Sequence, residues 1–293
     1  YNELAYNVTI EDVYESGTGK NRNINDTLMK TIALVERNGD RTIGDFSVVL
    51  DENNEFAYTV SDTALRRFKA DVFGYKDPGE MKYEEANATA EDMIAYLCSY
   101  GKFGIGESSD PENPRDSFEV GKGYTKEEIL KLVNIRYAMS LNSYQKYIPT
   151  VIATGVSDES VASIMENSNS LLGVAIAEDT IRKYNDALYF SQIIGYTGKI
   201  SENELETFNN VSAEELGETD KVRSDYILTD MVGKAGIERT LETYLQGVKG
   251  SETVYVNNLG KVIKNTKTID PVAGNDVYLT IDADLQKAVY NIL

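Results

Sequence analysis

The sequence predicts an α+β fold, in which helices and strands mix without a regular repeat. Strand-like and helix-like segments interleave along the chain, but they do not follow the strand–helix–strand rhythm of a doubly wound sheet. The chain has 293 residues, of which 41% are hydrophobic and 26% are charged. This composition is typical of a globular protein, and the length allows a substantial core in one large or two ordinary domains.

The N-terminal part predicts a strand, two helices and a hairpin. Runs of β-branched and aromatic residues indicate strands, and Asn, Asp or Ser before an apolar helical periodicity indicates a helix start. In order, we expect a strand over residues 4–10, a turn at 16–19, a helix capped by Asn25-Asp26 and ending near Gly39, a hairpin of residues 46–50 and 56–60, and a helix from Ser61 or Asp62 to Phe68.

The rest of the chain alternates helices with short strands. Thr125 and Glu128 form a capping-box signature, which predicts a helix start. Residues 76–88 and 104–123 are polar connectors around a helix at about 89–99. Further on, we expect a strand at 150–153, a helix from Ser157 to Glu166, a strand at 173–177, a helix-rich stretch from Ser201, and strands at 253–256, 261–265 and 276–281.

The order of elements predicts two pieces. Residues 20–145 are expected to form a mostly helical insertion subdomain. Residues 1–19 and 146–293 are expected to form the α+β core from which it projects.

Composition excludes several functions. The formal net charge of −19 argues against nucleic acid and against an anionic bilayer surface, because phosphate contacts need clustered Lys and Arg. No apolar run approaches the roughly 20 residues of a membrane span, the longest being residues 171–177. Any membrane anchor is therefore expected to lie outside this chain.

Histidine is absent, and its absence excludes several kinds of catalytic and metal-binding site. A Ser-His-Asp or Cys-His site cannot be built, and one cysteine cannot complete a zinc site. Cys98 lies in a helix-like apolar segment, which favours a buried small hydrophobe over a reactive thiol. An enzyme made from this chain would have to use carboxylates, Lys, Tyr or a Ser-Lys pair, and we expect no cofactor and no metal.

Three patterns in the last 112 residues carry the strongest signal. The first contains Arg182 and Tyr184, followed by Gly195 and Gly198. The second contains Gly233, Gly236 and Glu238, followed by Leu245, Gly247 and Gly250. The third is the segment DVYLTID, with Thr280 and Asp282, after which Gln286 opens the next helix.

These patterns resemble those of the N-terminal pedestal, or dimerisation, domain of class B penicillin-binding proteins. They are similar to R-x-Y-P…H-x-x-G-Y-x-G, G-x-x-G-x-E…L-x-G-x-x-G and D-V-x-L-T-I-D, although Asn185 and Gln192 replace the usual proline and histidine. The resemblance covers about half of the chain. It implies a penicillin-binding-protein dimerisation-domain-like fold that lacks the transpeptidase domain.

The motif residues are expected to be structural. Gly233, Gly236, Gly247 and Gly250 suit positive φ angles or close backbone approach. Glu238 falls in the first turn of a helix over residues 238–246, where the helix dipole favours a carboxylate. We hypothesise that it pairs with Arg182; the alternative is that both are solvated surface charges.

Other patterns have simpler explanations. Ser143-x-x-Lys146 matches the S-x-x-K of Ser-Lys acyltransferases, and Ser140-x-Asn142 matches an S-x-N, but their order is wrong and no K-T-G follows. The Gly17–Lys20 stretch lacks the spacing of a P-loop, and the 51–55 loop lacks the glycine of an EF-hand. The 20 tyrosines could line a sugar or peptide groove, but core and strand positions explain them more simply.

The resemblance therefore implies a non-catalytic extracytoplasmic pedestal and interaction domain of a peptidoglycan D,D-transpeptidase. The resemblance implies a parent anchored by an N-terminal transmembrane helix missing from this chain. It implies as partners the parent's own transpeptidase domain, a membrane glycosyltransferase or other cell-wall assembly proteins, and a second copy of the chain. One alternative is a stand-alone extracellular module that binds a wall peptide or glycan, marked by an aromatic-lined pocket. A carboxylate-based hydrolase, with two acids about 5–10 Å apart in a cleft, is another.

Overall fold

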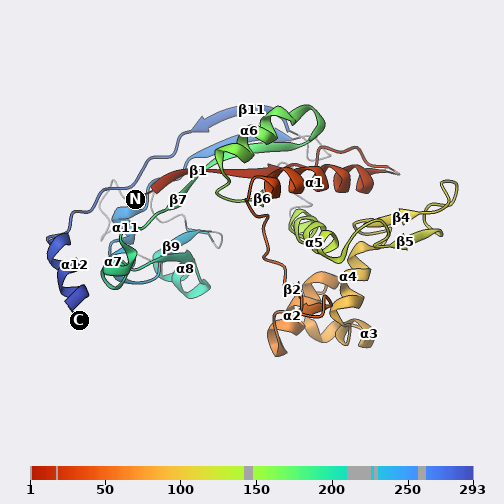
Figure 1. The fold of residues 1–293 in the computed structure, drawn as a ribbon, viewed down its shortest axis with the longest axis horizontal. Coiled ribbons are helices and arrows are strands. Elements are labelled where there is room, and N and C mark those ends of the chain that lie inside the picture. Colours follow the sequence, from red (N-terminus) through yellow and green to blue (C-terminus); the bar gives the residue numbers. More distant parts are fainter. Residues whose placement is uncertain are drawn as a thin grey trace. The chain divides into compact units, whose positions relative to one another are not determined.

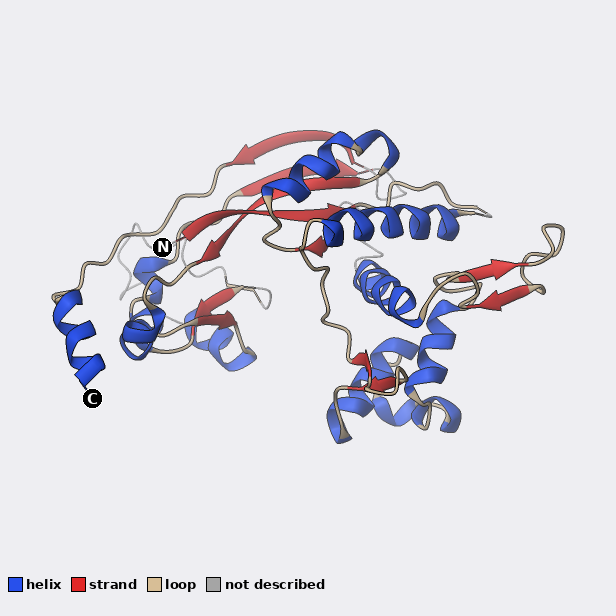
Figure 2. Ribbon diagram, in the orientation of Figure 1, coloured by secondary structure: helices blue, strands red, loops and turns tan. Residues whose placement is uncertain are grey.

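The computed structural model describes residues 2–17, 19–141, 148–209, 226–227, 230–256 and 262–292, and it confirms the α+β fold (Figures 1 and 2). The chain folds into two compact units. The N-terminal unit comprises Leu4–Ile181, and the C-terminal unit comprises Tyr1–Glu3, Arg182–Asn257 and Val262–Leu293. The division of the chain at residues 20 and 145 stays a prediction.

The N-terminal unit combines a three-stranded sheet with helices and two small hairpins. Its strands are β1 (Asn2–Ile10), β2 (Val48–Leu50), β3 (Phe56–Tyr58), β4 (Gly106–Ser108), β5 (Phe118–Val120), β6 (Thr150–Ala153) and β7 (Val174–Arg182). Its helices are α1 (Lys20–Arg37), α2 (Asp62–Phe73), α3 (Tyr83–Ala86), α4 (Ala90–Cys98), α5 (Lys126–Leu141) and α6 (Asp158–Glu166), with short 3₁₀ turns at Pro78–Glu80 and Ser168–Ser170. Strands β1 and β7 each extend by their outermost residues into the C-terminal unit.

Strand β1 is the centre of the sheet, whose order is β6-β1-β7. It pairs antiparallel with β6, with Val8 opposite Ala153 and Ile10 opposite Thr150. Every residue from Asn7 to Ile10 is buried, so both faces of this end of β1 are covered. The fully buried residues of α1 and α5 join the same core, among them Leu28 and Leu132.

Helix α1 begins at Lys20, and the predicted cap at Asn25 was wrong. Asn25 is fully buried in the middle of the helix. Its amide donates to the carbonyls of Phe103 (3.0 Å) and Gly104 (3.1 Å), and its Oδ1 accepts from Arg136 Nη1 at 3.1 Å. Tertiary hydrogen bonds therefore engage a side chain that, judged locally, has the chemistry of a helix cap.

Several other helix predictions are confirmed. Glu128 accepts from the backbone N–H of Thr125 at 2.8 Å, and the Glu128 N–H donates to Thr125 Oγ1 at 3.3 Å, which completes the predicted capping box at α5. Helix α2 runs to Phe73, five residues beyond the prediction, and ends where Gly74 adopts a φ of 88°. The strands at 150–153 and 173–177 and the helix at 157–166 also form, the second strand as part of the longer β7.

The predicted connectors at 76–88 and 104–123 were partly wrong, because they contain α3 and the β4–β5 hairpin. Each strand of this hairpin has three residues, too few for a readable alternation of apolar and polar positions. The hairpin depends on Gly106, whose φ is 150° and where a Cβ would lie 2.3 Å from the carbonyl oxygen of Glu119. The 51–55 loop is an ordinary turn, closed by Asp51 accepting from the N–H groups of Asn53 and Glu55.

Cys98 is buried as predicted. Burial raises the pKa of its thiol to about 12, so the group stays protonated at neutral pH and packs as a small hydrophobe.

The C-terminal unit is built from short elements. Its helices are α7 (Ala187–Ile194), α8 (Glu202–Asn209), α10 (Gly236–Thr240), α11 (Glu242–Leu245) and α12 (Ala283–Ile292), and its strands are β8 (Thr197–Lys199), β9 (Met231–Gly233), β10 (Ser251–Val256) and β11 (Val262–Ile269). Strands β8 and β9 pair antiparallel, as do β10 and β11. A small core of Ile200, Tyr226 and Val232 lies beside β9. No helix in the described ranges is long and apolar enough to cross a bilayer.

The predicted strand at residues 276–281 was wrong. The segment pairs with no strand among the described residues, and the side chains of Tyr278, Leu279 and Ile281 are exposed. Its alternating apolar pattern identifies side chains that would suit a sheet face, but a strand also needs a hydrogen-bonding partner. The next helix, α12, begins at Ala283 rather than at Gln286.

Candidate functional site

The motif residues predicted from the sequence gather in the C-terminal unit. We call them the motif cluster, defined as Arg182, Tyr184, Gly195, Gly198, Gly233, Gly236, Glu238, Leu245, Gly247 and Gly250. They lie on or beside the end of β7, helices α7, α10 and α11, and the β8–β9 pair. The remaining two predicted residues, Thr280 and Asp282, lie in the segment before α12.

The hypothesised Arg182–Glu238 pair is present. Arg182 Nε donates to Glu238 Oε1 at 2.8 Å, and the Glu238 side chain is only 4% exposed. Arg182 Nη1 also donates to Asn2 Oδ1 at 3.2 Å. The guanidinium therefore ties the end of β7 to α10 and to the start of β1. Glu238 occupies the first turn of α10 as predicted, although the expected helix over 238–246 is interrupted at Leu241.

Two motif glycines allow α7 and α10 to meet backbone to backbone. A Cβ on Gly195 would lie 1.8 Å from the carbonyl oxygen of Ala235, and a Cβ on Gly236 would lie 2.5 Å from that of Ile193. Both residues have positive φ, 83° and 60° respectively. Sterics thus exclude any side chain at either position.

Three other motif glycines serve close approach without the positive φ of Gly195 and Gly236. A Cβ on Gly233 would lie 2.2 Å from the carbonyl of Glu238. Added Cβ atoms would lie 2.1 Å from the carbonyl oxygen of Val272 at Gly247, and 2.6 Å from that of Ile269 at Gly250. Close backbone approach is therefore confirmed for Gly233, Gly247 and Gly250, and positive φ for Gly236.

The remaining predicted residues have different surroundings. Tyr184 Oη is buried and makes no hydrogen bond within the described part of the chain. Gly198 lies in β8 opposite Val232. Thr280 is exposed. Asp282 accepts from the N–H groups of the first turn of α12, at 3.0 and 2.9 Å, so it caps this helix.

Glu242 is a central residue that the sequence analysis missed. Its side chain is buried, and its Oε2 accepts from the Gly233 N–H at 2.7 Å. The Tyr226 hydroxyl donates to its Oε1 at 3.4 Å. Glu242 follows Glu238 by four residues, a spacing that places two carboxylates on one helical face. That spacing was the signal from which Glu242 could have been predicted. The carboxylate accepts from the backbone of Gly233, a residue of the second pattern.

Burial raises the pKa of the Glu242 carboxyl, and the backbone N–H of Gly233 opposes this shift only in part. The folded state therefore binds this proton more tightly than the unfolded chain does. By linkage, the contribution of Glu242 to stability falls as pH rises from the ordinary glutamate pKa, near 4.5, through the raised value.

We expect Glu242→Gln to remove this pH dependence. The amide keeps an acceptor for the Gly233 N–H but cannot ionise. The difference in unfolding free energy between Glu242→Gln and the wild type should therefore shift in favour of the variant as pH rises from about 4 to 7. Urea unfolding at several pH values measures it, with the exposed Glu206→Gln as the control. A difference that is flat with pH would contradict the assignment.

Glu204 and Lys234 form a second ion pair beside the cluster. The Lys234 ammonium, followed by the N–H and hydroxyl of Ser201, lowers the pKa of Glu204 to about 2. Ser201 and Glu204 make a capping box at α8, so an S-x-x-E search could have found this carboxylate. Gly274 was also missed; a Cβ there would lie 1.9 Å from the carbonyl oxygen of Leu245.

The motif cluster is thus a set of interlocking backbone turns closed by buried carboxylates. Arg182 and Glu238 bond to each other, and Glu242 accepts from the Gly233 backbone. Within the described ranges no group of three or more His, Cys, Asp or Glu side chains could hold a metal ion. Ser143, Lys146 and Asn142, which form the acyltransferase-like patterns, lie outside the described residues.

Comparison of the chain with protein-family models identifies its family. Residues 1–279 match the model described as the penicillin-binding protein dimerisation domain. The chain is 34% identical over 142 residues to the peptidoglycan D,D-transpeptidase MrdA of Escherichia coli K12, which is 48% of this chain and 21% of that protein. It is 32% identical over 139 residues to penicillin-binding protein 2A of Bacillus subtilis, or 47% of this chain and 18% of that protein.

Solved structures of penicillin-binding proteins also match along the chain. Penicillin-binding protein 2B of Streptococcus pneumoniae strain 5204 aligns with a TM-score of 0.49 and 18% identity, over 99% of this chain and 39% of that one. The chain spans about a fifth of the length of the curated relatives it matches.

Proposed function

Because this chain belongs to the family of penicillin-binding protein dimerisation domains, we propose that it is the non-catalytic pedestal of a peptidoglycan D,D-transpeptidase. In this role it holds the parent's catalytic domain and contacts other cell-wall assembly proteins. Its relatives are peptidoglycan D,D-transpeptidases of which it covers about a fifth, so the chemistry is assigned to the part it does not cover.

The construction of the motif cluster is the observation that carries this proposal. Arg182 and Glu238 neutralise each other, and Glu242 is occupied by a backbone N–H. Gly195 and Gly236 are held against opposing backbone carbonyls. These contacts support a structural role for Arg182, Glu238 and the two glycines, rather than contact with a substrate.

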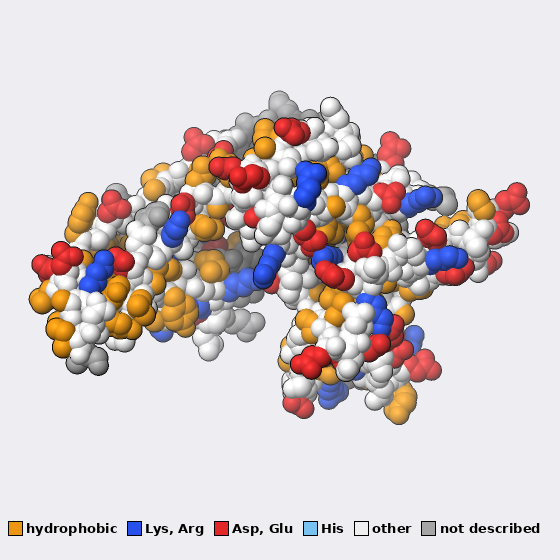
Figure 3. Space-filling model, in the orientation of Figure 1, with side chains coloured by type: hydrophobic (Ala, Val, Ile, Leu, Met, Phe, Trp, Pro, Cys, Tyr) orange, Lys and Arg blue, Asp and Glu red, His pale blue; other side chains and the backbone are white. Residues whose placement is uncertain are grey.

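An apolar surface on α7 and α12 supports the pedestal role. Helix α12 contacts α7 through the pair Tyr189 and Tyr290, whose ring centroids are 5.2 Å apart. Leu188, Leu285 and Ile292 nevertheless keep 63%, 65% and 82% of their surface exposed, and hydrophobic side chains gather over this part of the molecule (Figure 3). Contiguous exposed apolar surface marks an interaction site. We assign it to the parent's own transpeptidase domain.

The proposal places the domain on the extracytoplasmic face of the bacterial membrane, where peptidoglycan is cross-linked, with the parent anchored by an N-terminal transmembrane helix. A membrane glycosyltransferase, other assembly proteins and a second copy of the chain are the further partners proposed. The net charge of −19 disfavours nucleic acid as a partner.

Labelling with a fluorescent penicillin tests the non-catalytic assignment. We expect no covalent label on this chain, because β-lactams acylate the serine of a Ser-Lys site, and we assign that site to the parent's transpeptidase domain. Intact mass spectrometry after incubation gives the same readout, with a complete D,D-transpeptidase as the positive control. A label at Ser143, removed by Ser143→Ala, would overturn the assignment. The sequence encoded after Leu293 provides a second test, since the proposal requires a transpeptidase domain there.

A further inference from the structure

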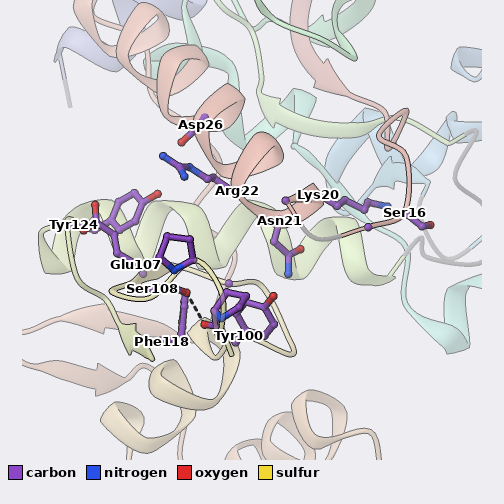
Figure 4. A pocket seen from close by; sticks show the side chains of 16 residues that line it. Ser16, Lys20, Asn21, Arg22, Asp26, Tyr100, Glu107, Ser108, Phe118 and Tyr124 are labelled. Atoms are coloured by element: carbon purple, nitrogen blue, oxygen red, sulfur yellow. Dashed lines mark hydrogen bonds between the residues drawn. The ribbon is translucent and has the colours of Figure 1, made fainter. Parts of the chain in front are cut away.

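We propose that a pocket in the N-terminal unit binds a short oligosaccharide. The pocket has a volume of about 720 Å³ and lies between the first turn of α1, the β4–β5 hairpin and the loop before α5 (Figure 4). Pockets of a few hundred to about 1,000 Å³ hold small organic ligands. This inference does not rest on the pedestal role.

Three aromatic side chains form the apolar part of the pocket. Tyr100, Phe118 and Tyr124 line it, and each is half-buried. The rings of Tyr100 and Phe118 meet edge to face with centroids 5.5 Å apart, which leaves a ring face available to a ligand. Neither the Tyr100 nor the Tyr124 hydroxyl hydrogen-bonds to another residue in the described part of the chain. Both are therefore available as donors and acceptors.

Acidic and basic side chains of the pocket lie close enough to Tyr124 to affect its hydroxyl. Burial raises the pKa of this tyrosine; Asp26 and Glu107 raise it further, while Arg22 lowers it. All three charged side chains line the pocket and are exposed. Figure 4 shows Arg22 and Asp26 on the same side of the pocket as Tyr124. None of the three forms an ion pair with another described residue.

The pocket walls are already held in place by internal bonds. The Asn21 amide donates to the Lys102 carbonyl at 2.8 Å and accepts from Arg136 at 2.6 Å. The Ser108 hydroxyl donates to the Pro114 carbonyl at 2.6 Å, which fixes the loop of the β4–β5 hairpin (Figure 4). A pocket ordered before binding loses less conformational entropy when a ligand enters.

This chemistry selects a saccharide over a charged ligand. The C–H face of a pyranose ring packs on an aromatic ring, and its hydroxyls need donors and acceptors together. Arg22 and the tyrosine hydroxyls supply donors, while Asp26 and Glu107 supply acceptors. A polyanion would meet the two carboxylates and a chain of net charge −19. A free peptide could reach only Arg22 with its terminal carboxylate, because Lys20 is already paired with Asp12 at 2.5 Å; the experiment below therefore includes D-alanyl-D-alanine as a competitor class.

Calorimetric titration of the whole chain with N,N′,N″-triacetylchitotriose tests the proposal. We expect saturable one-to-one binding with a Kd on the order of 1 mM or tighter. Arg22→Gln and Tyr124→Phe should each weaken it at least about fivefold, because each removes donors from an intact pocket. The matched controls, Arg66→Gln on α2 and Tyr83→Phe on α3, alter exposed residues that do not line the pocket and should not change the Kd.

Several outcomes would overturn the saccharide assignment. These are an absence of saturation up to about 10 mM, an unchanged affinity in both pocket variants, and saturation by D-alanyl-D-alanine but not by the sugar. Circular dichroism confirms that each variant is folded. The penicillin experiment is independent: a chain that binds the sugar but is acylated by penicillin contradicts only the pedestal role.

Discussion

Gly195→Ala is expected to unfold the motif cluster, with a loss of at least about 3 kcal/mol of stability. Gly195 has φ 83° and ψ −152°, a backbone region that is essentially restricted to glycine. The added methyl would also lie 1.8 Å from the carbonyl oxygen of Ala235. Because that obstacle is backbone rather than a flexible side chain, α7 and α10 must separate to accommodate it.

Gly198→Ala, three residues further along, is the matched control. There a Cβ would come no closer than 3.2 Å to any neighbour, and that neighbour is the flexible side chain of Lys234. Thermal unfolding by circular dichroism should therefore show a large fall in Tm for Gly195→Ala and little change for Gly198→Ala. Equal Tm values for the two variants would mean that the α7–α10 approach does not hold the unit together.

The motif glycines could be predicted because the family resemblance marks their positions, although the carbonyls that lie against Gly247 and Gly250 belong to Val272 and Ile269, well separated from them in the sequence. Gly233, Gly247 and Gly250 lie against backbone carbonyls, as the family pattern led us to expect. The Arg182–Glu238 pair could be hypothesised because Glu238 sits in the first turn of a predicted helix, with Arg182 the basic member of the first pattern. Capping boxes such as the one at Thr125 could be predicted because their hydrogen bonds join residues only three positions apart.

What the sequence could not show depends on contacts between distant segments. Asn25 has the side chain of a helix cap, and its burial inside α1 is explained by hydrogen bonds to Phe103, Gly104 and Arg136, at least 78 residues away. The segment 276–281 has the alternation of a strand but pairs with none of the described strands. The binding pocket joins α1 to a hairpin of two three-residue strands, which no periodicity reveals.

Substitutions in the two units are therefore expected to change different measured quantities. In the C-terminal unit, substitutions at Gly195 and Glu238 should change stability, because Gly195 lies against the Ala235 carbonyl and Glu238 pairs with Arg182. In the N-terminal unit, Arg22 is exposed and forms no ion pair with another described residue, so its substitution should change binding without changing the Tm. This contrast separates a residue that supports the fold from one that contacts a ligand.

Glu238→Ala is expected to lower the stability of the C-terminal unit by about 3 kcal/mol, since removing one partner of a buried pair leaves the other charge uncompensated. Glu238 is nearly inaccessible, whereas Arg182 retains 27% of its side-chain surface, and that exposure keeps the effect below the largest known values. The Arg182–Asn2 hydrogen bond remains, so the end of β7 should loosen rather than detach.

Glu206→Ala on α8 is the control, because it removes an exposed carboxylate from the same unit. The Tm should fall for Glu238→Ala and stay within error for Glu206→Ala, and amide hydrogen exchange should accelerate at α10 and at the end of β7. Glu238→Gln adds a further comparison: it keeps an acceptor for Arg182 without the charge, so its Tm should lie between those of the wild type and Glu238→Ala. If Glu238→Ala leaves the Tm within error, the ion pair has no role in stability, and the glycine contacts alone join α7 to α10.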